Sequence, residues 1–162
     1  MKTLLMGLMV SLLSFTAVAQ TAPATAAQPP SLVLPEHDLR QRIALLVATA
    51  KEKGSSGATL EDYGSYKVQL SVRIKSGGAE VHAHWDDVMM VELGHATLIT
   101  GGTVVGGESK PDGEMPGKRI EGGQSHELGP GTVFTVRAGT PHQTIVPPGV
   151  IYAAVVVKIH EP

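Results

Sequence analysis

The sequence predicts an all-β protein, a sandwich or jelly-roll barrel preceded by one short helix. Its 162 residues include 19 glycines and 11 prolines, and only 17% of them are charged. This composition suits short strands joined by tight turns. Between residues 66 and 160, short runs of alternating apolar and polar residues recur at regular spacing. Such spacing is typical of sandwiches and jelly rolls, in which successive strands are antiparallel neighbours.

Length, charge and cysteine content limit the functional classes. The length suits one domain. A formal net charge of −2 gives no electrostatic footprint for nucleic acid. Because cysteine is absent, disulfides, thiolate ligands and cysteine nucleophiles are excluded. Any metal must therefore be bound by nitrogen and oxygen atoms.

Residues 1–19 have the pattern of a signal peptide. Lys2 supplies the positive charge, residues 4–15 are apolar, and Ala17-Val18-Ala19 is a small-x-small cleavage site. We expect a periplasmic or secreted protein without a membrane span after cleavage, because a span needs about 20 apolar residues. An uncleaved anchor is the alternative. Residues 20–35, rich in Ala, Thr and Pro, indicate a flexible leader.

A helix is predicted over residues 36–54. Apolar residues recur there at helical spacing, at Leu39, Ile43, Leu46, Val47 and Ala50. Gly54 suits a C-cap. We expect this helix to cover one sheet or one end of the barrel, and a dimer contact is the alternative.

The barrel is predicted over residues 60–160. Its expected strands are 66–74, 88–92, 96–100, 125–128, 133–136, 144–146 and 151–159. The polar, glycine-rich residues 106–123 indicate a long surface hairpin or loop, either an exposed connection or a lid. The apolar strand 152–159 is expected at a sheet edge, where it could pair with a second copy.

Three histidines are the strongest candidates for chemistry. Residues 77–93 are predicted to be extended, so His82 and His84 share one face, and Trp85 lies on the opposite, outer face. Two imidazoles side by side need a third ligand from elsewhere to form a metal site. His142, at the end of the Gly-Thr-Pro-His turn of residues 139–142, is placed to supply it.

These segments resemble the two sequence motifs of the cupins. His82-Ala83-His84, followed by residues 87–94, is similar to the first motif, a His-x-His pair, a carboxylate, an apolar strand and a glycine turn. Residues 131–142 are similar to the second motif, which ends at the ligand histidine. The resemblance covers residues 66–159 and implies a single-domain cupin with a double-stranded β-helix. It also implies a homodimer and a metal bound by His82, His84, Asp87 and His142.

The sequence departs from this pattern at three positions. Asp87 stands where the family usually has a longer glutamate, so Asp86 and Glu80 are alternative ligands. Glu80 shares a face with His82 and His84 by period-two counting. Arg137 stands where proline is usual, and Val146 stands where asparagine is frequent.

Histidine and carboxylate ligands suit a divalent transition metal, with Fe, Mn, Zn, Ni and Cu all compatible. The first functional hypothesis is an exported metalloenzyme acting on a small organic substrate, of the oxygenase or the isomerase or lyase type. In this hypothesis Asp87, where it is not a ligand, serves as a base. The second is a non-catalytic module that binds a small ligand or a metal, and the third is an exported structural barrel.

Overall fold

The structure is a computed structural model that describes residues 31–162. The predicted signal peptide and most of the leader, residues 1–30, lie outside the described residues. The helix α1 spans Glu36–Lys53. The strands are β1 (Ser55–Asp62), β2 (Tyr66–Arg73), β3 (Trp85–Leu93), β4 (Ala96–Thr100), β5 (Thr103–Val105), β6 (Arg119–Glu121), β7 (Gln124–Leu128), β8 (Val133–Val136), β9 (His142–Ile145) and β10 (Tyr152–His160). Within residues 31–162, no helix is long and apolar enough to cross a membrane.

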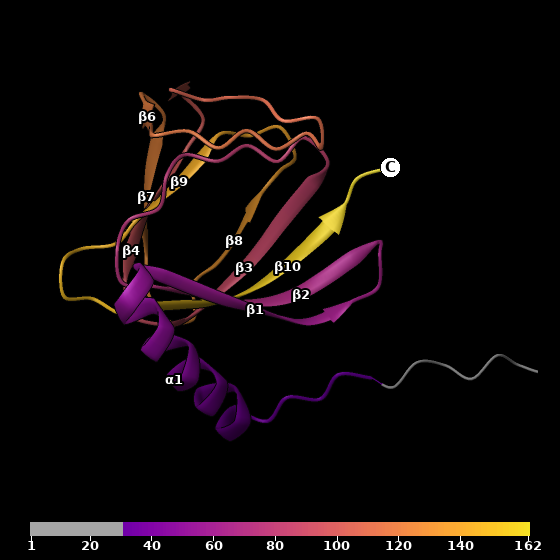
Figure 1. Ribbon diagram of the computed structural model, residues 1–162, viewed down its shortest axis with the longest axis vertical. Coiled ribbons are helices and arrows are strands. Elements are labelled where there is room, and N and C mark those ends of the chain that lie inside the picture. Colours follow the sequence, from indigo (N-terminus) through magenta and orange to yellow (C-terminus); the bar gives the residue numbers. More distant parts are fainter. Residues whose placement is uncertain (1–30) are drawn as a thin grey trace, which may run out of the picture. The chain divides into compact units, whose positions relative to one another are not determined.

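The strands form antiparallel sheets, which confirms the predicted all-β jelly roll with a short N-terminal helix (Figure 1). One sheet has the order β1-β2-β10-β3-β8, and a second has the order β7-β4-β9. Strands β5 and β6 pair with each other in a small third sheet. Both larger sheets contribute to one apolar core, formed by Val91, Ala96, Leu98, Leu128, Val136, Val146, Tyr152 and Ala154.

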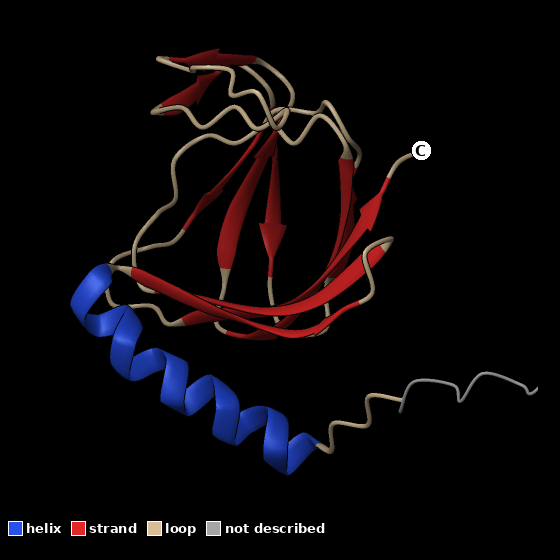
Figure 2. Ribbon diagram, turned by 45° about the vertical axis from the view of Figure 1, so that its right-hand side comes forward, coloured by secondary structure: helices blue, strands red, loops and turns tan. Residues whose placement is uncertain are grey.

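The helix α1 packs on the outer face of the first sheet, as Figure 2 shows. Its buried residues Ile43 and Ala50 join a cluster with Leu70 and Val72 of β2. The helix ends where Gly54 adopts the left-handed conformation, at a φ of 92°, and donates its N–H to the carbonyl of Ala50. The predicted covering role of the helix is therefore confirmed.

Strand β2 uses its two faces in an unusual way. Its apolar residues Leu70 and Val72 face the helix outside the barrel. The residues that alternate with them, from Lys67 to Arg73, line a cavity on the other face. The interior of the barrel is therefore polar along this strand, and this polar face positions several side chains beside the candidate site.

Two expectations about strands are wrong. Strand β10 pairs with β2 on one side and with β3 on the other, so it is central, and the edge strands of this sheet are β1 and β8. The barrel also begins before residue 60, because β1 pairs with β2 from Ser55 onward. The Ser-Ser-Gly-Ala-Thr sequence of β1 has little intrinsic strand preference, and pairing with β2 overrides it. The homodimer stays a prediction.

The glycine-rich loop after β5 folds over the extended segment that precedes β3. Met115 and Val81 exchange backbone hydrogen bonds of 2.9 and 3.1 Å. Isolated bridges join Ala79 to Gly117 and His82 to Glu114. The loop is therefore a surface hairpin, as predicted, and these backbone bonds hold it against the segment that carries His82. The lid alternative stays a prediction.

Candidate metal centre

Two chain segments far apart in the sequence meet at the candidate site. Glu80 donates its backbone N–H to the carbonyl of His142, and His142 donates its own N–H to the carbonyl of Glu80, both at 2.9 Å. Gly139 donates its N–H to the carbonyl of His82 at 2.8 Å. These bonds fix the Gly-Thr-Pro-His turn against the segment that carries His82.

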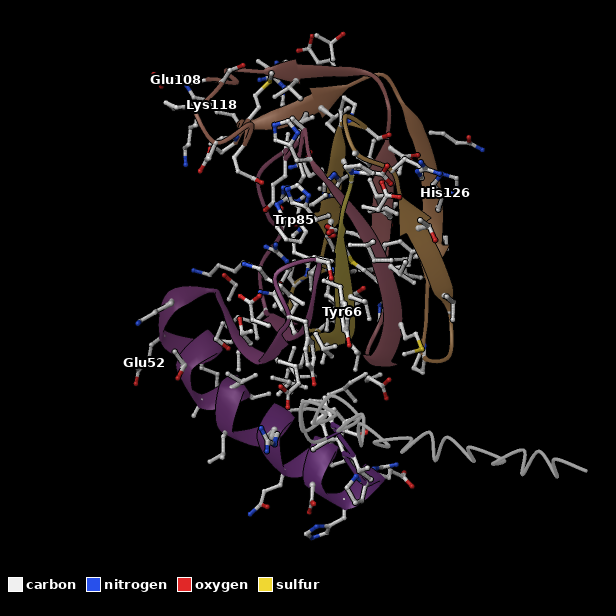
Figure 3. The ribbon with its side chains drawn as sticks, turned by 90° about the vertical axis from the view of Figure 1, so that its right-hand side faces the viewer. Glu52, Tyr66, Trp85, Glu108, Lys118 and His126 are labelled. Atoms are coloured by element: carbon white, nitrogen blue, oxygen red, sulfur yellow. The ribbon has the colours of Figure 1, made fainter. Side chains whose placement is uncertain are left out.

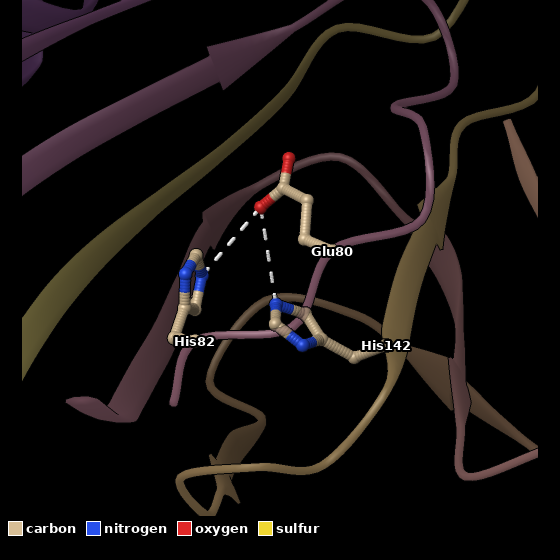
Figure 4. Close-up of side chains that lie close together, drawn as sticks. All are labelled: Glu80, His82 and His142. Atoms are coloured by element: carbon tan, nitrogen blue, oxygen red, sulfur yellow. Dashed lines mark ion pairs between the residues drawn. The ribbon is translucent and has the colours of Figure 1, made fainter. Parts of the chain in front are cut away.

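Glu80, His82 and His142 place their ligand atoms within 4.8 Å of one another. Figure 4 shows Glu80 between the two imidazoles, with its Oε2 3.7 Å from His82 Nε2 and 3.9 Å from His142 Nε2. The two rings lie 5.1 Å apart between centroids. The Nε2 atoms of both histidines therefore converge on one carboxylate oxygen.

Both histidines are oriented through their other ring nitrogen. His142 Nδ1 donates to the carbonyl of Thr140 at 3.2 Å, and His82 Nδ1 lies 2.5 Å from Glu114 Oε2. With the Nδ1 atoms protonated, the Nε2 lone pairs are free to bind a cation. A histidine whose second nitrogen donates to a carboxylate or a carbonyl is the usual arrangement of a metal ligand.

Asp87 is a fourth potential ligand at the same point. Its Oδ2 lies 3.5 Å from His82 Nε2 and 3.9 Å from His142 Nε2. Its Oδ1 accepts a hydrogen bond from Lys158 Nζ at 2.6 Å. The side chain of Asp87 is almost completely buried, so the Lys158 ammonium stabilises a carboxylate that water does not reach.

The geometry of these donors fits a divalent transition ion. Ligands about 2.1 Å from one ion lie roughly 3.0–3.5 Å from each other in octahedral or tetrahedral sites. The separations of 3.5–3.9 Å between the carboxylate oxygens and the imidazole nitrogens need only a small contraction. Two imidazoles with one or two carboxylates form a donor set for Fe, Mn, Zn or Ni, with positions left for water or substrate.

Burial lowers the pKa of His142, and the charge of nearby His82 acts in the same direction. The hydrogen bond to Thr140 and the carboxylates of Glu80 and Asp87 oppose this shift only in part. The neutral imidazole is the metal-binding form. The site therefore favours this form of His142 at neutral pH.

His84 lies outside this group. Its ring is exposed and stacks on His160, with 6.3 Å between centroids. Residues 83 and 84 form a bend between the bridge at His82 and the start of β3 at Trp85. The period-two alternation is interrupted there, so His82 and Asp87 face the site although they are five residues apart. Ligation by His84 stays a prediction of the resemblance, and the geometry brings Glu80 to the site in its place.

Asp86 turns away from the site and supports the turn before His142. It accepts a hydrogen bond from the Ala138 N–H at 2.6 Å, and Arg137 Nε lies 2.9 Å from its carboxylate. The Ala138 hydrogen bond is the main cause of the lowered pKa of Asp86. Arg137, which replaces the usual proline, therefore holds this turn through an ion pair.

A cavity of about 400 Å³ opens from the site, and Trp85 lines it. Figure 3 shows Trp85 below the loop that carries Glu108 and Lys118. The expectation that Trp85 lies on the outer face is wrong, because the bend after His82 reverses the alternation. Sequence reasoning also missed Glu114 as the partner of His82. It comes from a loop without periodicity, so no local pattern indicated it.

Comparison with known structures gives fold-level similarity. The cupin domain of Cnp3 from Schizosaccharomyces pombe has a TM-score of 0.50 at 9% identity, covering 66% of this chain and 65% of that one. The protein TT1209 from Thermus thermophilus has a TM-score of 0.50 at 15% identity, covering 68% of this chain and 87% of that one. The DMSP lyase DddQ from Ruegeria pomeroyi DSS-3 has a TM-score of 0.48 at 16% identity, covering 67% of this chain and about half, 48%, of DddQ.

No family model matches the sequence, and no curated protein matches it. The structural similarity, at identities this low, concerns the fold. The antiparallel double sheet, the two motifs in their order and the converging histidines all agree with it. The chain therefore has the fold of a cupin domain.

Proposed function

We propose that this protein is a mononuclear metalloenzyme that acts on a small organic substrate outside the cytoplasm. The observation that carries the proposal is the convergence of Glu80, His82 and His142, two of which, Glu80 and His82, line an open cavity of about 400 Å³. Two histidines and one carboxylate with open positions are the donor set of many non-haem Fe(II) oxygenases. Mn, Zn, Ni and Cu stay alternatives.

A bound divalent ion would polarise a substrate oxygen or activate water or O₂. The chain's own residues do the rest. Glu114 and Thr140 fix the two imidazole rings, and the loop of residues 106–118 covers His82 from solvent. Asp87 either binds the ion through Oδ2 or takes a proton there, while Oδ1 stays on Lys158.

Export is the second part of the proposal. It rests on the signal-peptide pattern of residues 1–19 and the absence of cysteine. Fractionation of a Gram-negative host that expresses the full chain tests it. We expect a periplasmic protein whose N-terminus is Gln20, and a cytoplasmic protein that begins at Met1 would contradict export.

Metal content of the untagged protein, measured by plasma mass spectrometry, tests the site. We expect about one equivalent of a transition metal, lost in His142→Ala and Glu80→Ala, because each removes a ligand of a three-residue group. His84→Ala is the matched control and should keep the metal. Loss of metal in His84→Ala and His142→Ala, with metal kept in Glu80→Ala, would favour the ligand set of the cupin resemblance. No metal in any sample after reconstitution would refute the metalloenzyme.

One observation favours a second function, a non-catalytic module that binds a small ligand. The three carboxylates of the site are all engaged, Glu80 by Arg73, Asp87 by Lys158 and Glu114 by His82. An engaged carboxylate is a weaker general base. Substrate screening with the metal-loaded protein separates the two functions, because a binding module shows ligand-dependent stabilisation without turnover.

A further inference from the structure

Four charged side chains form one row across the first sheet. In the strand register, Asp62 of β1 is opposite Lys67 of β2, which is opposite Lys158 of β10, which is opposite Asp87 of β3. Ion pairs join the ends of the row, at 3.2 Å between Lys67 and Asp62 and at 2.6 Å between Lys158 and Asp87. The middle of the row is a pair of lysines on adjacent strands.

This lysine pair breaks a rule of sheet pairing. Like charges directly opposite each other on antiparallel strands repel, and their side chains share one face of the sheet. Lys67 and Lys158 both face the cavity that opens from the candidate metal centre. Their exposed fractions are only 33% and 17%, so water screens the repulsion incompletely. Local rules are typically broken where function requires it.

The charge of the cavity wall gives a second argument. Three basic side chains of the wall, Lys67, Arg73 and Lys158, face three carboxylates of the wall, Glu80, Asp87 and Glu114, and Lys67 also pairs with the carboxylate of Asp62. With these four carboxylates counted, a divalent ion at the site would leave one positive charge in excess. An anionic ligand restores neutrality, whereas a cationic ligand adds to the repulsion.

We propose that this cavity binds a small organic acid whose carboxylate lies between Lys67 and Lys158 while a second oxygen points to the metal centre. The contact of the second oxygen with a metal rests on the proposed function, whereas the binding of the carboxylate by the two lysines does not. Trp85 lines the same cavity, and Lys67 Nζ lies 5.2 Å from the centroid of its ring. The substrate class is therefore a carboxylic acid with a second oxygen donor.

Calorimetric titration of the untagged full chain with malate tests the proposal, in the metal-free and in the metal-loaded protein. Malate supplies a carboxylate and a hydroxy acid that can chelate a metal. Dimethyl malate is the uncharged control with the same carbon skeleton. We expect malate to bind and dimethyl malate not to bind, with tighter malate binding in the metal-loaded protein.

Lys67→Gln is the decisive variant. Lys67 pairs with the half-exposed Asp62, so its removal leaves no buried charge without a partner. Lys158→Gln would leave Asp87 buried and unpaired. We expect Lys67→Gln to weaken malate binding about tenfold or more, the effect of one charge-assisted hydrogen bond. Lys51→Gln on the exposed face of α1 makes the same change in net charge and should bind malate like the wild type.

The outcomes separate the two proposals. Malate binding that depends on Lys67 supports the anion site, with or without metal in the protein. Failure of metal uptake together with such binding would refute the metalloenzyme and leave the anion site standing. Equal affinity for malate in Lys67→Gln, equal binding of the dimethyl ester, or no malate binding in either form of the protein would overturn the anion site.

Discussion

Strands β3 and β10 each run from an apolar core at one end to a charged site at the other. In β3, Val91 belongs to the core between the two sheets, and Asp87 lies beside the imidazoles four residues earlier. In β10, Ala154 belongs to the same core, and Lys158 binds Asp87. Both ends therefore belong to the same two strands, but one end buries apolar side chains and the other end buries charged ones.

This difference separates stability from function. Apolar burial contributes roughly 25 cal/mol per Å², whereas a buried ion pair repays its desolvation cost only partly. We therefore expect the apolar end to stabilise the barrel and the charged end to contribute little stability of its own. Substitutions at the apolar end should change the free energy of unfolding, and substitutions at the charged end should change the metal affinity.

The largest effect is expected at the apolar end. Val91→Ala removes two methylene equivalents from a side chain that is 2% exposed and leaves a small cavity. We expect the free energy of unfolding to fall by about 2–3 kcal/mol, measured by urea denaturation. The same substitution at Val133, which is 61% exposed, is the matched control and should change it by less than about 0.5 kcal/mol.

Metal affinity of the folded Val91→Ala protein sharpens the comparison. We expect it to equal that of the wild type, because Val91 lies in the core cluster and the candidate ligands Glu80, His82 and His142 do not belong to it. A large loss of metal affinity in Val91→Ala would show that packing at the apolar end affects metal binding at the charged end. That result would contradict the separation of stability from function.

Tyr152 lies at the border between the two ends. It belongs to the apolar core, and it also lines a cavity of about 40 Å³ behind His142. Burial raises its pKa to about 12, and nearby Arg73 opposes the shift. Above the ordinary value of 10.0, the unfolded chain releases the phenol proton while the folded protein keeps it. Stability should therefore fall as the pH rises from 10.0 toward about 12.

Tyr152→Phe measures this effect. Each pH unit of this interval contributes at most about 1.4 kcal/mol, so the total loss in the wild type is roughly 2 kcal/mol. We expect urea denaturation at neutral and alkaline pH to show this additional loss in the wild type and not in Tyr152→Phe. Tyr66→Phe, an exposed control, keeps Tyr152 and should follow the wild type. Identical alkaline profiles for wild type and Tyr152→Phe would contradict the prediction.

At the charged end, Glu114 is expected to act on metal binding through His82. Glu114→Ala removes the acceptor for His82 Nδ1 and with it the orientation of the ring. We expect the metal affinity to fall about tenfold or more, or about 1.4 kcal/mol, with little change in the free energy of unfolding. Competition with a chelator measures it.

Glu108→Ala in the same loop is the control for Glu114→Ala, and it should bind metal like the wild type. Glu114→Gln keeps an acceptor oxygen, so its metal affinity should lie between those of Glu114→Ala and Glu108→Ala. If Glu114→Ala lowered stability and left metal affinity unchanged, the loop would be a structural cover without a role in orienting His82.

The sequence predicted the apolar end better than the charged end. Alternation located β2, β4 and β8 well, because a half-buried strand imposes its period on local sequence. The same rule failed at residues 83 and 84, where one bend reverses which side chains face inward. It therefore favoured His84 and placed Trp85 outside the cavity.

The remaining contacts of the site depend on register and not on local pattern. The pairing of Lys67 with Lys158 joins positions 91 residues apart, and it exists only because β10 lies between β2 and β3. The motif spacing did predict that His82 and His142 meet. The sequence determined the carboxylate less well, because Glu80, an alternative in the sequence, and Asp87 both lie beside the two histidines.

The smallest effect is expected at Arg137, where an exposed ion pair replaces the usual proline. Arg137→Ala removes the contacts with Asp86 and Glu161, and the side chain is 72% exposed. Exposed ion pairs contribute about 0–1 kcal/mol, so urea denaturation should show a change of that size. Asp86→Ala also removes the acceptor for the Ala138 N–H and should cost more stability than Arg137→Ala. If both variants matched the wild type in stability and in metal content, the backbone bonds to Glu80 and His82 would hold the turn before His142 without the side chains of Asp86 and Arg137.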